Sequence, residues 1–306
     1  EALAPTGEMD FDCLPPDKQK IYRAIQTAHI HGSPDGPWFF IIARHDPYTK
    51  RYQLMGITDT SMLRPQVFAL QESRKVIRWR PVWVYASDLF SCPIALVLSY
   101  MPGLKIIYHE HDHPGFDLGL LPRLFMRSRK VLSARATMVI LPNDSRAAAF
   151  KEETGRQGIS VWNCPRRNEA CGRTKDSDCL TLYYHGTVNS NLLPPTFLEA
   201  VARAGPCVRL KVTGYETFGS MGYRDVLRKT AADLRIEDRF ELIGAAKRKD
   251  IMRICREADV GIACMPIETK DLNFSSMAGA SNKAFDYMAC GLALLVSDIP
   301  EWHEMY

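Results

Sequence analysis

The stretch from Ser281 to Asp298, which reads SNKAFDYMACGLALLVSD, combines a short helix with a buried strand. Ser281 and Asn282 are good residues for the N-cap of a helix, and Gly291 suits the position just after its end. The apolar run from Leu292 to Val296 is typical of a strand buried on both faces. A helix followed by such a strand predicts one unit of an open parallel α/β sheet.

The start of the same helix has the chemistry of an anion site. A helix N-terminus presents free N–H groups and the positive end of the helix dipole, and Lys283 adds a cation there. Lys283 and Asp286 are three residues apart, so they share one face. Spacing alone favours a surface ion pair on a packing helix. The alternative is a nucleoside diphosphate site, in which Lys283 and the helix end bind the diphosphate and Asp286 accepts from ribose hydroxyls.

Strands and helices alternate through the whole second half of the chain. Its predicted strands end at Gly186, Gly214, Gly244, Pro266 and Ser297. Ligands of open α/β sheets bind beyond the carboxyl ends of the strands. We therefore expect a binding site formed by these strand ends.

The first half repeats the alternation less regularly. Its apolar runs predict buried strands over residues 38–43, 82–85, 105–108 and 138–141. Residues 165–178 are polar and lack periodicity, which indicates a domain boundary. The sequence therefore predicts two doubly wound α/β domains in tandem, residues 1–168 and residues 178–306, with a cleft between them.

Composition excludes several classes of protein. The chain has 306 residues and a net charge of +4, a balance that gives no general reason to expect a nucleic acid partner. No apolar run approaches the ~20 residues that a membrane-spanning helix needs. The nine cysteines form no Cys-x-x-Cys pair, so we interpret most of them as reduced residues of a cytoplasmic protein.

Residues 120–135 form a basic amphipathic stretch. It contains five cations and no acid: Arg123, Arg127, Arg129, Lys130 and Arg135. This pattern fits the charged outer face of an ordinary domain helix. It also fits peripheral contact with anionic lipid, which would place the protein on the inner face of the membrane.

Histidines alternate along residues 109–113, directly after a predicted strand. If the strand continues, His109, His111 and His113 share one face. With Asp112 they are a candidate zinc site of a metal-dependent hydrolase. Alternatively, residues 109–113 form a solvated polar loop that has no catalytic or binding role.

The stretch from Ser281 to Asp298 resembles the nucleotide-sugar signature of glycosyltransferase family 4, a retaining family with the GT-B fold. Residues 184–187 resemble the first strand and glycine loop of its donor domain, and residues 140–143 resemble the end of its acceptor domain. The resemblance implies two Rossmann-like domains around a cleft, with the acceptor side N-terminal and the nucleotide-sugar side C-terminal. It also implies a fragment that lacks both ends, with the first domain incomplete at its start and the second truncated.

The resemblance assigns roles to individual residues. The implied donor-binding residues are Gly186, Thr187, Gly214, Gly244, Asn282, Lys283 and Asp286. His111 is placed near the donor sugar or its diphosphate, and Asp112 or Glu110 orients or deprotonates the acceptor hydroxyl. Lys283 and the helix end stabilise the departing diphosphate. We therefore expect no cofactor and no metal ion in the chemical step, only a nucleotide-diphosphate sugar as co-substrate.

The sequence also departs from the family. The first of the two Glu residues that the family often carries falls on Ala278, and Asp286 is a shortened version of the second. A cation usual after the first donor strand is replaced by residues 188–191. We expect sugar transfer with retention to a saccharide or lipid-linked acceptor, in polysaccharide biosynthesis. A GT-B-like nucleotide-sugar epimerase is an alternative, and the metal-dependent hydrolase is a third.

Overall fold

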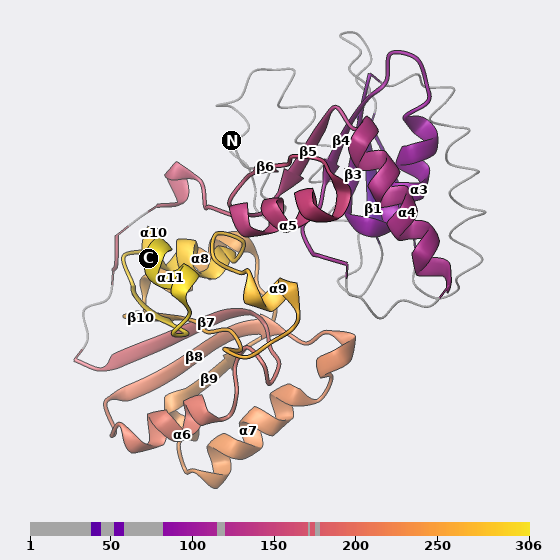
Figure 1. Cartoon of the computed structure of the whole chain (residues 1–306). Coiled ribbons are helices and arrows are strands. Elements are labelled where there is room, and N and C mark those ends of the chain that lie inside the picture. The colour runs from indigo at the N-terminus through magenta and orange to yellow at the C-terminus, as the bar shows by residue number, and fades with distance from the viewer. Residues whose placement is uncertain (1–37, 44–51, 58–81, 115–119, 171, 175–177) are drawn as a thin grey trace. The chain divides into compact units, whose positions relative to one another are not determined.

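A computed structural model describes residues 38–43, 52–57, 82–114, 120–170, 172–174 and 178–306 (Figure 1). The chain divides into two compact units, one ending at Val161 and the other beginning at Trp162. Each unit is built on its own β-sheet, and each is described by itself below.

The sheet of the N-terminal unit has the strand order β2-β1-β3-β4-β5-β6. Its strands are β1 (Trp38–Ala43), β2 (Tyr52–Ile57), β3 (Trp83–Ser87), β4 (Lys105–His109), β5 (Met138–Leu141) and β6 (Ile159–Ser160). Strands β3 to β6 pair in parallel, as the apolar runs predict, whereas β1 is antiparallel to both β2 and β3. The chain between β1 and β2 is too short for the crossover that a parallel pair needs, so these strands form an antiparallel edge that the sequence analysis did not predict.

Three helices of this unit have described bounds. They are α3 (Asp88–Leu98), α4 (Leu120–Arg135) and α5 (Asp144–Thr154). Helix α5 begins after Asn143, whose side chain accepts from the backbone N–H of Arg146, an N-cap bond. It ends at Gly155, whose φ of 78° gives the left-handed cap that glycine favours. The core lies between the helices and the central strands and includes Val84, Ile106 and Val139.

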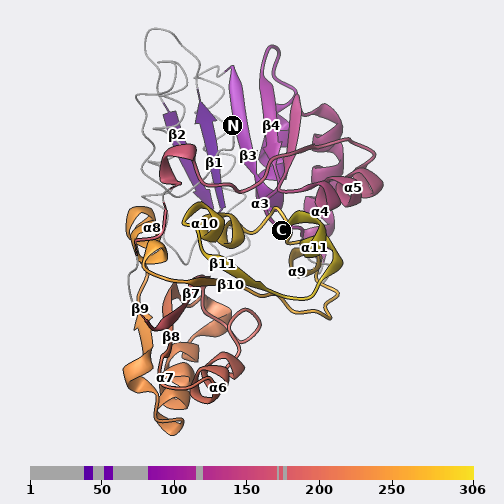
Figure 2. The ribbon, with the colours of Figure 1, turned by 90° about the vertical axis from the view of Figure 1, so that its left-hand side faces the viewer.

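The sheet of the C-terminal unit is parallel throughout, in the order β11-β10-β7-β8-β9 (Figure 2). Its strands are β7 (Leu180–Thr187), β8 (Val208–Tyr215), β9 (Phe240–Ile243), β10 (Val260–Ala263) and β11 (Ala293–Val296). Strands β8 and β9 follow β7 on one side of it in the sheet, and β10 and β11 lie on the other side of β7. The order therefore reverses between β7 and β10, which is the switch point where such sheets bind ligands.

Helices cover both faces of this second sheet. They are α6 (Thr196–Arg203), α7 (Tyr223–Asp233), α8 (Arg248–Arg256), α9 (Leu272–Ser275), α10 (Asn282–Ala289) and α11 (Pro300–Met305), with 3-10 turns η2 (Arg167–Glu169), η3 (Phe218–Ser220) and η4 (Glu237–Arg239). Figure 1 and Figure 2 show α6 and α7 on one face and α8, α10 and α11 on the other. This arrangement confirms the predicted doubly wound α/β class.

The C-terminal unit begins at Trp162 because this segment packs on the loop before α10. The Trp162 ring stacks on Phe285 with centroids 6.0 Å apart. The backbone N–H of Asn163 donates to the Gly279 carbonyl at 3.2 Å, and its side-chain amide donates to the Ala280 carbonyl at 2.6 Å. Among the described helices, none is long and apolar enough to cross a membrane.

Candidate functional site

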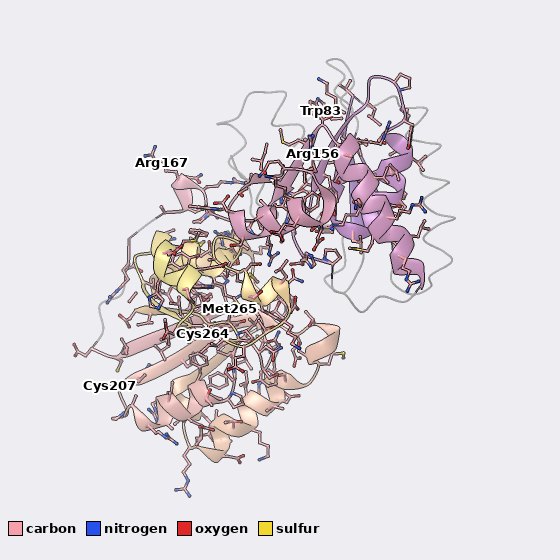
Figure 3. All side chains as sticks on the ribbon, in the orientation of Figure 1. Trp83, Arg156, Arg167, Cys207, Cys264 and Met265 are labelled. Atoms are coloured by element: carbon pink, nitrogen blue, oxygen red, sulfur yellow. The ribbon has the colours of Figure 1, made fainter. Side chains whose placement is uncertain are left out.

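Helix α10 is fixed against the switch point by its tyrosine and by a glycine beneath it. A Cβ at Gly261, in β10, would lie 2.0 Å from Cγ of Tyr287, so only glycine lets the helix approach this closely. The Tyr287 hydroxyl donates to the Ile262 carbonyl at 3.1 Å and accepts from the backbone N–H of His185 at 3.2 Å. One side chain therefore ties α10 to both β10 and β7. Figure 3 shows Cys264 and Met265 just past the end of β10, inside the C-terminal unit.

The first turn of α10 directs Lys283 across the end of β7. Gly186 has a φ of +117°, and a Cβ there would lie 3.0 Å from Cε and 3.2 Å from Nζ of Lys283. A side chain at position 186 would therefore meet both an unfavourable backbone conformation and the lysine. Glycine is required at this position because the ammonium occupies the space above it.

The Lys283 ammonium is buried, and no described residue forms an ion pair with it. The residue is 9% exposed, and burial lowers the pKa of its side chain to about 8, partly opposed by the charge of Asp286. Within the described part of the chain it makes no ion pair or hydrogen bond, and its nearest favourable contact is the Tyr184 ring, with Nζ 5.5 Å from the centroid. A buried cation is costly unless an anion pairs with it, so this position is suited to an anionic ligand.

A second polar group at the same helix end also lacks a partner. The Ser281 hydroxyl is buried, and none of the described residues hydrogen-bonds to it. The first N–H groups of a helix have no partner within the helix. Hydrogen-bond donors and the Lys283 cation thus share one helix end, the combination that binds phosphate groups elsewhere.

Three of the other predicted donor-binding residues, Thr187, Gly214 and Gly244, lie at strand ends, and Asn282 begins α10. Gly214 pairs with Gly186 in the ladder, and a Cβ on Gly214 would lie 2.1 Å from the Gly186 carbonyl oxygen. Thr187 accepts the Tyr184 hydroxyl through its carbonyl, and Asn282 is exposed at the start of α10. A Cβ on Gly244 would meet nothing within 4 Å, so packing does not explain glycine there.

Asp286 is fully buried and lies in an ion network. Its Oδ1 and Oδ2 accept from Nη2 and Nη1 of Arg248 at 2.6 and 2.5 Å. Arg248 also donates through Nε to Oε1 of Glu169 at 2.8 Å. Burial alone would raise the pKa of Asp286, but the hydrogen bonds and charges of His185 and Arg248 outweigh it and hold the pKa below its ordinary value.

This geometry differs from the contact predicted for Asp286. A carboxylate that accepts from ribose hydroxyls needs an exposed oxygen, and Asp286 has none while it holds Arg248. Sequence patterns did not predict Arg248, Glu169 or His185 beside Asp286, because their association depends on the tertiary fold. The shortening from Glu to Asp was the available signal, since a shorter acid reaches less far from its helix.

The histidines of the N-terminal unit do not converge on one point. The Tyr85 hydroxyl is 2.5 Å from Nδ1 of His109, whose ring stacks on His111 at 3.7 Å between centroids. His113 instead pairs with Glu153, 2.7 Å away. In the part of the chain that the structure describes, no group of three or more His, Cys, Asp or Glu side chains is arranged to hold a metal. The zinc-dependent hydrolase therefore has no site among these residues.

Glu110, predicted as a catalytic acid or base, is buried in an ion pair with Arg129. It is 3% exposed and accepts from Nε and Nη2 of Arg129 at 2.5 and 2.7 Å. The Tyr108 hydroxyl donates to it at 2.6 Å. Its carboxylate points into the core, toward an arginine from α4, whereas Asp112 has a side chain that is 71% exposed.

Asp88 organises the loop that carries His111 and Asp112. It is the first residue of α3, directly after β3, and has a φ of 59°, an uncommon conformation for a residue other than glycine. Its Oδ1 accepts the backbone N–H of His111 at 2.7 Å, and burial raises its pKa while the charge of His111 opposes the rise. Arg146 donates to the His111 carbonyl at 2.6 Å from the other side.

Helix α4 presents four of its five predicted cations to the surface. Arg129 is 1% exposed because it pairs with Glu110 and with Glu153. The exposed cations are Arg123, Arg127, Lys130 and Arg135. The Arg135 guanidinium stacks on Tyr100, 3.8 Å from the ring centroid.

Comparison with known proteins identifies the fold. No family model matches the chain, and no curated protein matches it. The solved structures of HepE from Anabaena in complex with UDP and glucose match with a TM-score of 0.59 at 15% identity, over 80% of this chain and 66% of that one. Sucrose-phosphate synthase from Thermosynechococcus elongatus matches with a TM-score of 0.59 at 14% identity, over 88% and 69%. A glycosyltransferase from Rickettsia africae matches with a TM-score of 0.58 at 10% identity, over 80% and 65%. The chain has the GT-B fold.

The chain spans about two thirds of the length of these GT-B structures. At such low identity the likeness carries the fold alone. Within the GT-B fold of this chain, Lys283, Gly186 and the free end of α10 lie together at the switch point of the second Rossmann-like sheet.

Proposed function

We propose that this chain is a glycosyltransferase that binds a nucleotide-diphosphate sugar at the carboxyl ends of β7 and β10. The observation that carries the proposal is the buried Lys283 ammonium, which has no counter-ion among the described residues and lies over Gly186. A diphosphate would supply the missing negative charge. HepE, which shares the fold, is described in complex with UDP and glucose, and this supports a nucleotide-sugar donor here.

The same groups suit the chemical step. As the bond between sugar and diphosphate breaks, negative charge grows on the diphosphate, and donors already in place lower the barrier without reorganising. Lys283 and the first N–H groups of α10 can supply this stabilisation from the chain itself. We propose that transfer proceeds with retention, as in family 4, and that no metal ion is needed for this step.

The acceptor side is proposed to be the N-terminal domain, residues 1–168, with the donor side in residues 178–306. His111 and Asp112 are its proposed catalytic residues. Asp112 is exposed, and Asp88 and Arg146 hold the backbone of this loop at His111. An exposed carboxylate on a loop that is fixed by hydrogen bonds can orient an acceptor hydroxyl or take its proton. The acceptor is proposed to be a saccharide or a lipid-linked saccharide of polysaccharide biosynthesis.

The test is a thermal-shift screen of the purified chain against UDP, GDP and ADP, followed by their sugars. We expect one nucleotide family to raise the unfolding temperature, because a ligand that binds only the folded state stabilises it. Lys229→Ala is the matched control for Lys283→Ala, because Lys229 is exposed and paired with Asp233 on α7. The control variant should show the same thermal shift as the wild type. Absence of stabilisation by all nucleotides would contradict the proposal. Conversion of a bound nucleotide sugar without any acceptor would favour the epimerase.

We also propose that α4 contacts anionic lipid, at the inner face of the membrane. Beside its four exposed cations, Leu124 and Val131 are 53% and 38% exposed, and Tyr100 nearby is 64% exposed. Apolar side chains flanked by cations are typical of peripheral binding. Co-sedimentation with vesicles should rise with the fraction of anionic lipid and fall when Arg123, Arg127 and Lys130 are replaced by Gln. Sedimentation independent of anionic lipid would contradict this.

A further inference from the structure

Asp286 and Lys283 lie one turn apart on α10 but make different contacts. Lys283 has no partner in the described residues, whereas Asp286 is 0% exposed and is held by both terminal nitrogens of Arg248. A bidentate pair of this kind fixes orientation as well as distance. The first turn of α10 therefore has one anchored residue and one residue available to a ligand.

The anchor extends across three more elements. Arg248 begins α8 and is joined through Nε to Glu169 in η2, at 2.8 Å. Glu169 is itself fixed, because the backbone N–H of Arg166 donates to it at 2.8 Å. On the other side of the carboxylate, Nε2 of His185 in β7 is 3.3 Å from Oδ2 of Asp286. Asp286 thus connects α10 to α8 directly, to η2 through Arg248, and lies against β7.

We propose that Asp286, held by Arg248, is a positioning residue that keeps the first turn of α10, and with it the Lys283 ammonium, against Gly186, and that it does not contact the ribose. This inference rests on the proposed diphosphate site. Arg248 and Glu169 are then positioning residues as well, and they act on the ligand site through Asp286.

The charge of Asp286 favours the protonated form of Lys283, in addition to the positioning role of its carboxylate. Burial lowers the pKa of Lys283 to about 8, and Asp286 opposes this decrease. The charged and titratable groups around this turn are Asp286 on α10, Arg248 on α8, and His185 and Tyr184 on β7. Asp286 is the one among them that favours the ammonium form, so its neutralisation lowers the charge available to an anion at pH 8 more than at pH 6.5.

The experiment measures the affinity of UDP and of inorganic pyrophosphate for wild type, Asp286→Asn and Arg248→Lys by calorimetry. A positioning role predicts that each variant weakens UDP and pyrophosphate by the same factor, about tenfold or more, since small displacements of binding groups are costly. Asp286→Asn should lose more affinity at pH 8 than at pH 6.5. Arg253→Gln, a control on the exposed side of α8, should change neither.

A ribose contact predicts a different pattern, which would overturn the inference. Asp286→Asn would then weaken UDP and leave pyrophosphate unchanged, because pyrophosphate has no ribose. Equal affinities of wild type and both variants for both probes would overturn it as well. If Asp286→Asn does not fold, Arg248→Lys, which keeps the charge but loses the bidentate geometry, decides the question. Failure of wild type to bind either probe would instead contradict the proposed function.

Discussion

Arg129 in the N-terminal unit and Lys283 in the C-terminal unit are both buried cations, 1% and 9% exposed, but their surroundings are opposite. Arg129 donates to Glu110 and to Glu153, and although burial alone would lower its pKa, the bonds and charge of Glu110 raise it. Lys283 has no such acceptor among the described residues, and its pKa falls to about 8. A satisfied buried cation belongs to the core, whereas an unsatisfied one indicates a binding site.

The largest expected effect is on the satisfied cation. Arg129→Ala leaves Glu110 buried without its partner, and breaking such a pair costs about 3–5 kcal/mol. Urea denaturation should show this loss of stability. Arg123→Ala, at an exposed position of the same helix, should stay within about 0.5 kcal/mol. Similar stabilities for the two variants would remove the distinction between a core cation and a surface one.

The unsatisfied cation should behave in the opposite way. Lys283→Met removes a buried charge that has no counter-ion among the described residues, so stability without ligand should rise by roughly 1–3 kcal/mol at pH 7. The folded-state pKa of about 8 lies below the ordinary value of 10.5, so the unfolded state binds more protons between these values. The wild type therefore regains stability as pH rises from 8 to 10.5, and the advantage of the variant shrinks. Destabilisation by Lys283→Met at pH 7 would contradict this.

A substitution at Gly186 tests whether the Lys283 side chain requires a residue without a Cβ beneath it. Gly186→Ala forces alanine into a φ of +117° and against the Lys283 side chain, and a left-handed conformation alone costs about 1–2 kcal/mol. We expect a lower melting temperature together with weaker nucleotide binding. Gly219→Ala is the matched control, because its Cβ would meet nothing within 4 Å and its φ is not in the left-handed range. Equal melting temperatures would show that the close approach has no consequence.

The smallest effect on stability is expected at Asp112. Because its side chain is 71% exposed, Asp112→Asn should change the free energy of unfolding by no more than about 0.5 kcal/mol, while reducing sugar transfer. Glu110→Gln should instead lower the free energy of unfolding clearly, because it weakens the buried pair with Arg129. Denaturation and transfer rates measured on both variants separate the two carboxylates, and loss of stability at Asp112 would place it in the core network.

The sequence predicted the doubly wound α/β class of the fold. Local patterns suffice for this, because apolar runs and the glycines at strand ends each act over a few residues. The partners of Asp286 and Glu110 were not predicted. Each is an arginine from another element, Arg248 and Arg129, and only the tertiary fold brings them together.

The edge strands β1 and β2 show the same limit. An apolar run predicts a buried strand at Trp38–Ala43 but not its direction, because direction depends on the strand with which it pairs. The sequence did not predict that the Asp88 carboxylate accepts the backbone N–H of His111, because these residues are far apart in the chain. Features that depend on contacts far apart in the chain therefore need the structure.

The most direct measurement is the affinity of Lys283→Ala for the nucleoside diphosphate that stabilises the wild type, determined by calorimetry at pH 7. A charge-assisted contact contributes about 1.5–3 kcal/mol, so we predict a loss of affinity of roughly tenfold to a hundredfold, with the unliganded variant at least as stable as the wild type. Unchanged affinity in a folded Lys283→Ala variant would contradict the assignment of this buried ammonium as the diphosphate-binding group.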